Sequence, residues 1–111
     1  MTDVKAKLKE AQYRLGAFAK ATPELIAGFA KVSKTATAAG RFSSAQRELI
    51  AVSIAVAKGC EDCILYHVDA AIRHAATEVE LLEALEVAVE MGGGPAVMYA
   101  GKALEAFRNL S

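Results

Sequence analysis

The sequence has no tryptophan and only a few aromatic residues, prolines and cysteines. Aromatic residues make up 6% of its 111 residues, with two prolines and two cysteines, while hydrophobic residues reach 54%. The apolar surface therefore comes mainly from Ala, Val, Leu and Ile, a composition that suits closely packed helices. A chain of this length predicts one domain that folds without metal or disulfide staples. Because its apolar content exceeds what one small domain needs inside, we expect a homo-oligomer.

Long apolar runs and a dominant charge are also missing. The longest apolar stretch, residues 49–57, is interrupted by Ser53 and is too short to span a bilayer, and it predicts a helix surrounded by protein. Residues 1–5 are charged and lack the apolar core of a secretory signal. Thirteen basic and thirteen acidic residues are interspersed, and their charges sum to zero. The charged residues around Lys7 in the first helix predict a solvated helix face. We expect a cytoplasmic protein that binds neither membrane nor nucleic acid.

Strand signals are nearly absent, and glycine, proline and capping residues divide the chain into about six predicted helices. These helices cover roughly residues 3–19, 24–38, a segment after 43 that holds Glu48, 60–75, 78–91 and a last segment from 95. The predicted fold class is an all-α bundle in a single domain. In this arrangement an N-terminal helix, within residues 1–21, belongs to the same domain as a core of residues 22–111.

Capping residues and apolar periodicity predict where the helices begin and which faces are covered. Ser43 with Gln46 and Thr77 with Glu80 form two predicted capping boxes, and Thr22 is the predicted N-cap of the second helix. Apolar residues recur every three or four positions along the first two helices. Those predicted to face inward include Leu15, Phe18, Leu25, Phe29 and Val32.

Four residues that can carry chemistry follow the pattern E-x11-C-x2-C-x3-H, namely Glu48, Cys60, Cys63 and His67. On one helix the two cysteines and the histidine share a face, with Cys63 and His67 one turn apart. A helix N-terminus, a cationic histidine and a C-x-x-C pair each lower the pKa of a thiol, and cysteines at this spacing can form a disulfide with little backbone change. Cys63 is therefore the cysteine expected to lie next to the base, His67. Glu48 belongs to the preceding helix, and the chain must fold back across the break at Gly59 for Glu48 to reach His67.

These residues resemble the signature of the AhpD-like alkylhydroperoxidase branch of the carboxymuconolactone decarboxylase family. The likeness runs from about Thr22 to Phe107 and includes segments 22–25, 47–51, 57–60 and 92–95. It implies an all-helical fold in which the peroxide-reactive thiol is Cys63, which passes through a sulfenic acid before Cys60 closes a disulfide. The resemblance also implies that His67 and Glu48 relay the proton.

The resemblance further implies an assembly, since members of the family are commonly trimers or hexamers. One position departs from the better-known two-domain members, which carry a histidine immediately before the reactive cysteine. Here Asp62 occupies that position, and a negative charge beside a thiol works against thiolate formation.

The sequence thus predicts a thiol-dependent peroxidase that reduces a hydroperoxide, is restored by an unidentified dithiol reductant, and needs no metal or cofactor. The alternatives are a decarboxylase-like enzyme of the same family, a non-enzymatic redox sensor, a zinc-stabilised oligomer, and two small buried cysteines without chemistry. Zinc would need its fourth ligand from Glu48 or a neighbouring subunit, because His74 lies too far along the helix from His67. The peroxide, the reductant and the choice between trimer and hexamer lie beyond what the sequence determines.

Overall fold

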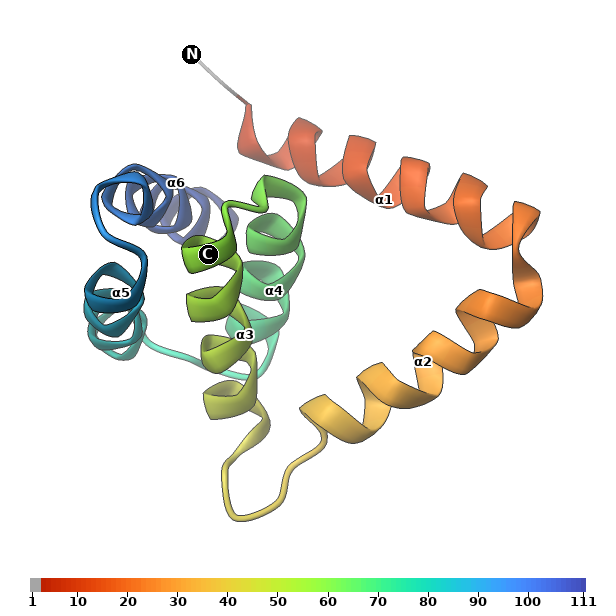
Figure 1. Cartoon of the computed structure of the whole chain (residues 1–111), viewed down its shortest axis with the longest axis horizontal. Coiled ribbons are helices and arrows are strands. Elements are labelled where there is room, and N and C mark those ends of the chain that lie inside the picture. The colour runs from red at the N-terminus through yellow and green to blue at the C-terminus, as the bar shows by residue number, and fades with distance from the viewer. Residues whose placement is uncertain (1–2) are drawn as a thin grey trace.

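The protein, described by a computed structural model over residues 3–111, folds into six helices with no strand in that range (Figure 1). The helices are α1 (Val4–Ala21), α2 (Pro23–Thr37), α3 (Ser44–Lys58), α4 (Glu61–Arg73), α5 (Glu78–Gly92) and α6 (Gly94–Leu110). The predicted all-α class is confirmed. Met1 and Thr2 lie outside the described residues. They are part of the N-terminal segment for which the sequence predicts no secretory signal.

The core is formed by α3, α4, α5 and α6, with α3 in contact with each of the other three. In Figure 1 these four helices are grouped together on one side of the molecule. The largest fully buried side chains come from three of them: Val52, Val56, Ile64, Val68 and Leu81. This packing holds the end of α3 beside the start of α4, where the two cysteines lie.

Helices α1 and α2 form a bent arm that leaves the bundle along α1 and returns along α2 toward α3 (Figure 1). Val4 and Leu8 anchor the first half of α1 in the core, whereas α2 has no buried residue. The inward orientation predicted for five apolar side chains of the arm is therefore wrong within one chain. Leu15, Phe18, Leu25, Phe29 and Val32 are between 48% and 63% exposed. Periodicity identifies an apolar face correctly, but it does not say whether the same chain covers that face.

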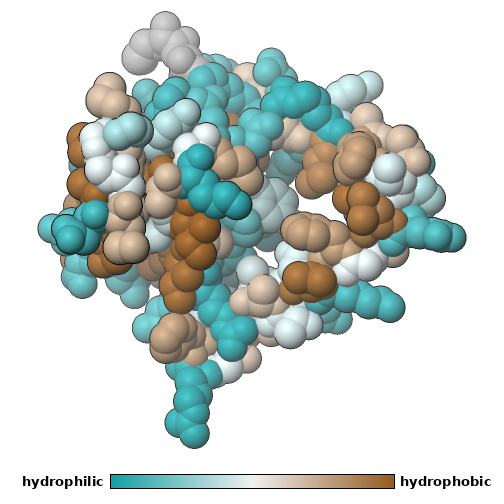
Figure 2. All heavy atoms as spheres, in the orientation of Figure 1, coloured by the Kyte–Doolittle hydropathy of each residue, from teal (hydrophilic) through white to brown (hydrophobic). Residues whose placement is uncertain are grey.

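Helix α3 is open on one side, contrary to the prediction that protein surrounds it. Ile50 and Ile54 are exposed and line an apolar groove of about 710 Å³ between α3 and α5, together with Val87 and Met91. Figure 2 shows hydrophobic side chains on the arm and over the bundle, on either side of a hollow in this face. Among the described helices, none is long and apolar enough to cross a membrane.

Local capping explains where α3 and α5 begin and where α3 ends. Both predicted capping boxes are present, the first at the start of α3 and the second at the start of α5. Thr22 precedes α2 but does not cap it through its side chain, because its hydroxyl donates instead to the Phe18 carbonyl at the end of α1. Gly59 ends α3 with φ +74°, a left-handed conformation that costs other residues energy. An added Cβ there would lie 3.2 Å from the Tyr99 ring, so both backbone and space favour glycine.

Candidate redox site

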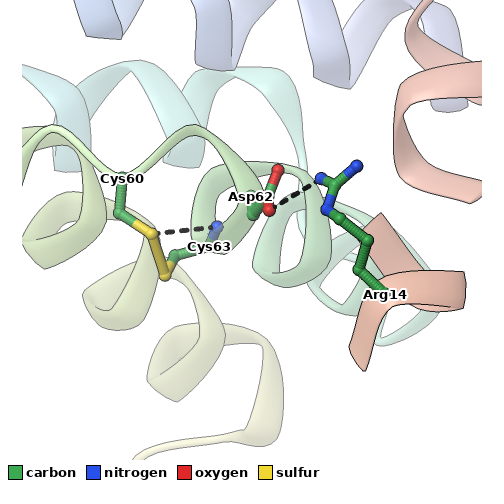
Figure 3. The surroundings of a disulfide bond; sticks show 4 residues. All are labelled: Arg14, Cys60, Asp62 and Cys63. Carbon is green, nitrogen blue, oxygen red and sulfur yellow. Dashed lines mark hydrogen bonds and ion pairs between the residues drawn. A yellow bond between two sulfur atoms is a disulfide. The ribbon is translucent and has the colours of Figure 1, made fainter. Parts of the chain in front are cut away.

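The two cysteines lie at the first turn of α4, directly after the Gly59 turn. Cys60 is the N-cap of the helix, and its Sγ accepts a hydrogen bond from the Cys63 backbone N–H at 3.3 Å (Figure 3). The two residues form a disulfide with their Cα atoms 5.3 Å apart. The expectation that this spacing permits a disulfide is confirmed. Closure and opening of the bond need no rearrangement of separate elements, because both sulfurs belong to one helical turn.

The two sulfurs differ in their surroundings. Cys63 is exposed, whereas Cys60 is only partly exposed. Cys63 lies one turn before His67 on the same helix, so it is the cysteine on the histidine side of the pair. Cys60, however, occupies the cap itself, where backbone N–H groups and the helix dipole favour a negative sulfur. Helix geometry therefore gives each cysteine one advantage as a nucleophile.

Glu48 and His67 are brought together from different helices. Glu48 Oε1 of α3 lies 2.6 Å from His67 Nδ1 of α4. The carboxylate is buried, with 4% of its residue surface exposed, and the imidazole side chain is 24% exposed. A carboxylate in such a place needs a partner. When the Glu48 carboxylate is ionised it only accepts hydrogen bonds, so His67 Nδ1 is the donor of this bond and Nε2 is the ring nitrogen left to exchange protons.

The predicted return of Glu48 across the Gly59 break is therefore present in the structure. The Gly59 turn reverses the chain, so residues 48 and 67 meet although nineteen positions separate them. The structure thus unites Glu48 with His67 and Cys60 with Cys63, and places both pairs on or against α4. The catalytic roles of the four residues stay predictions.

The two residues between the cysteines are paired with cations from distant helices. Asp62 accepts a hydrogen bond from Arg14 of α1 at 2.9 Å (Figure 3). Glu61 accepts from Lys102 of α6 at 2.7 Å and from Lys7 of α1 at 3.0 Å. These hydrogen bonds hold the pKa of Glu61 below its usual value, and the bond from Lys102 has a larger effect than the bond from Lys7.

Sequence reasoning missed these three cations. Lys7 was predicted to lie on a solvated face of the first helix, and it instead binds the second residue of the C-E-D-C segment. The only signal in the sequence is that Lys7 and Arg14 are seven residues apart and so share one face of α1. Nothing in that spacing indicates that the face meets α4.

Other residues considered from the sequence lie at the margin of the site. Tyr66 packs edge-on against His67, with ring centroids 5.1 Å apart. His74 is exposed at the C-cap of α4, at the opposite end of the helix from the cysteines. Across residues 3–111, no group of three or more His, Cys, Asp or Glu side chains is arranged to hold a metal ion. The zinc alternative therefore has no ligand set within one chain in this disulfide-bonded form.

The fold and the site place the chain among small all-α proteins with a C-x-x-C pair at a helix N-terminus. The sequence profile of the carboxymuconolactone decarboxylase family matches residues 23–106, and the chain belongs to this family. It is 47% identical to an uncharacterised protein of Cupriavidus necator over 110 residues, which are 99% of this chain and 97% of that one. It is 36% identical to an uncharacterised protein of the Paracoccus denitrificans cox locus, covering 94% and 92% of the two chains.

Two solved structures of the family have a similar fold. A family member from Legionella pneumophila, solved in its apo form, is 43% identical, with a TM-score of 0.93 over 99% of each chain. A family member from Thermotoga maritima is 23% identical, with a TM-score of 0.82 over 94% of this chain and 89% of that one. The description of the Thermotoga protein raises involvement in an antioxidative response as a possibility. At that identity the likeness concerns the fold alone.

Proposed function

We propose that the protein is a thiol-dependent peroxidase that reduces hydroperoxides through Cys60 and Cys63. The observation that carries the proposal is the Glu48–His67 hydrogen bond, which fixes an imidazole one turn after Cys63 on the helix that holds the disulfide. A buried carboxylate that orients a histidine is a common support for general acid–base chemistry. The combination of an oriented base and a reversible disulfide is what a peroxide-reducing thiol enzyme requires.

The reaction begins at Cys63, the more exposed sulfur. Its thiolate attacks one oxygen of the hydroperoxide, the O–O bond breaks, and the sulfur becomes a sulfenic acid while an alcohol leaves. The Cys60 sulfur then attacks the sulfenic sulfur, which releases water and forms the disulfide seen between the two residues. A separate dithiol returns two electrons and two protons by thiol–disulfide exchange. Peroxide is thereby reduced and the dithiol oxidised, with no further reactant.

His67 and Glu48 handle protons in this scheme. The Nε2 atom of His67 takes the proton of Cys63 and supplies it to the departing alkoxide. Glu48 holds the ring through Nδ1 and stabilises the positive charge that forms on it. Proton transfer by a positioned side chain contributes roughly 10² to 10⁴ in rate, so the pair accounts for part of the catalysis and the thiolate for the rest.

The decarboxylase chemistry in the family's name is the less favoured function for this chain. Decarboxylation of a lactone acid needs no pair of sulfurs, whereas here two cysteines are joined at the first turn of α4. The disulfide therefore favours redox chemistry. A dithiol reductant is required for turnover, and we propose the cytoplasm as the location because its thiols are kept reduced.

A stoichiometric oxidation of the reduced protein tests the proposed function. One equivalent of an alkyl hydroperoxide is expected to consume both thiols, produce one equivalent of alcohol and lower the protein mass by two hydrogens, because one disulfide forms per peroxide. Thiol titration and mass spectrometry measure these changes, and a protein alkylated before peroxide addition is the control. Thiol loss no faster than that of a free cysteine peptide would contradict the proposal.

We also propose that the chain assembles with copies of itself into a trimer or a hexamer. The arm exposes an apolar stripe on α2 formed by Leu25, Phe29 and Val32, and the same chain exposes an apolar groove between α3 and α5. Apolar surface of this extent is rarely left in water, and an arm that leaves its own bundle is well placed to cover a neighbour. A second copy provides both surfaces at once.

The assembly proposal predicts that Phe29→Lys lowers the oligomeric state. A buried lysine ammonium without a partner is costly, so the charged side chain opposes contact with an apolar groove. Ala27→Lys is the matched control, because Ala27 is exposed on the opposite side of α2 and acquires the same charge. Sedimentation or light scattering gives the mass in solution. A monomeric wild type, or equal effects of the two variants, would count against this interface.

A further inference from the structure

The segment between the two cysteines carries two carboxylates, whose negative charges are offset by basic side chains from other helices. Glu61 and Asp62 stand between the sulfurs, where negative charge opposes thiolate formation. Their ion pairs bring in Lys7 and Arg14 of α1 and Lys102 of α6. Two negative charges are thus met by three positive ones, so this group carries a net charge of +1. Other titratable residues of the same four helices include Glu10 of α1, Glu48 and Lys58 of α3, His67 of α4 and Glu105 of α6, and Glu105 lies close enough to Lys102 to contribute to its raised pKa.

Helix α1 is built to deliver two of these cations. Val4 and Leu8 are buried and fix its first two turns against the bundle. Lys7 and Arg14 are seven residues apart, so both lie on the face that meets α4, with the partly buried Ala11 between them. Their partners Glu61 and Asp62 are neighbours in the first turn of α4. A single helix face therefore contacts both residues that separate the redox cysteines.

We propose that Lys7 and Arg14 of α1 are positioning residues of the redox pair, which set the reactivity of Cys63 by offsetting the carboxylates between the two cysteines. The inference rests on the proposed function in taking Cys63 as the reacting thiol. Cys60 and Cys63 lie on α4, and the family profile matches residues 23–106, so α1 lies outside the matched segment. Helix α1 therefore adds positive charge, from outside the matched segment, to a site that lies within it.

The physical basis is that reduction of the disulfide exposes a group that can ionise. A thiolate is stabilised by nearby positive charge and destabilised by nearby negative charge. With the arm docked, the acids are offset, the thiolate is favoured, and the disulfide is easier to reduce, since anything that stabilises the reduced form shifts thiol–disulfide exchange toward it. By linkage the reverse also holds, so ionisation of the thiol favours the docked arm.

The effect of each charge is modest, because the pairs are near the surface. The side chains of Arg14 and Asp62 are 59% and 57% exposed, and salt screens such charges within about 10 Å at 0.1 M ionic strength. One charge about 10 Å from a thiol in a largely aqueous medium shifts its pKa by roughly 0.3 unit at low salt. Lys102 keeps the pKa of Glu61 low, and Glu61 raises the pKa of Lys102. Glu61 and Lys102 therefore both stay charged across the pH range of a thiol titration.

The experiment measures the pKa of the Cys63 thiol from the pH dependence of iodoacetamide alkylation. It uses the full-length chain with Cys60→Ser, so that one thiol reacts, at about 10 mM ionic strength, where the screening length is about 30 Å. Arg14→Gln is expected to raise this pKa by roughly 0.3 unit and Asp62→Asn to lower it by a similar amount. The double variant should return close to the parent value, and Arg14→Lys should retain it because the charge is kept.

Arg73→Gln is the matched control, since Arg73 forms an exposed ion pair with Asp69 at the far end of the same helix. It should leave the thiol pKa unchanged, and the differences among the other variants should shrink at 1 M salt. In the chain with both cysteines, Arg14→Gln should also shift the equilibrium with dithiothreitol toward the disulfide by about two-fold. An unchanged thiol pKa in both Arg14→Gln and Asp62→Asn, or an equal shift in Arg73→Gln, overturns the proposal. Because the titration uses no peroxide, failure of the peroxidase proposal is observed separately.

Discussion

Replacing Cys63 with serine is expected to lower peroxide turnover by roughly a thousand-fold or more. A serine hydroxyl is not ionised near neutral pH, and its oxygen cannot take the place of sulfur in a sulfenic acid. The substitution is nearly isosteric at an exposed position, so the fold should be retained. Peroxide consumption in the presence of a dithiol reductant measures the loss, and the melting temperature shows that the variant is folded.

Cys60→Ser separates the two sulfurs. If Cys63 attacks first, this variant still reacts once with peroxide and stops at a sulfenic acid, which a sulfenic-acid-selective dione reagent traps and mass spectrometry detects. Multiple turnover is lost because no disulfide forms. The opposite pattern, with trapping in Cys63→Ser and none in Cys60→Ser, would assign the attack to the N-cap sulfur of Cys60. The helix-cap position would then outweigh proximity to His67.

Glu48→Gln is expected to lower turnover by roughly a hundred-fold. Glutamine has nearly the same shape and can still accept a hydrogen bond from His67 Nδ1, but its neutral amide does not stabilise the imidazolium that forms during proton transfer. Peroxide consumption in the presence of a dithiol reductant measures the loss.

An exposed glutamate provides the comparison for this substitution. Glu86→Gln on α5 removes one negative charge from the surface and should leave turnover unchanged. The thermal stability of both variants is measured in parallel. A Glu48→Gln protein that melts at lower temperature yet reduces peroxide at the wild-type rate would make the Glu48–His67 contact a structural one and remove it from the proposed mechanism.

Much of the fold follows from local signals in the sequence. Ser43 and Thr77 predict helix starts because their side chains form short-range capping hydrogen bonds. Gly59 predicts a helix end because glycine readily adopts a left-handed backbone conformation. The relation between Cys60 and Cys63 is equally local, because three positions on one helical turn set their separation. These features depend on residues within a few positions of one another, and for that reason the sequence predicts them well.

Features that depend on how whole helices meet were predicted less well. The contact between Glu48 and His67 was anticipated as a fold-back, but its length and burial come from the packing of α3 on α4. The position of the arm was not anticipated, because an apolar stripe such as that containing Phe29 is the same whether its own chain or another covers it. The ion pairs of Lys7 and Arg14 depend on that same arm and carried no signal in the sequence beyond their common face.

The location of Asp62 bears on how members of this family can diverge. The family profile matches residues 23–106 and so includes both sulfurs, Glu48 and His67, but not α1 (Val4–Ala21). In this chain the acidic residue directly before Cys63 is paired with an arginine on that preceding helix. If the proposed electrostatic role of Arg14 holds, a substitution on α1 changes the ionisation of a thiol on α4 while all four residues of the candidate site stay the same.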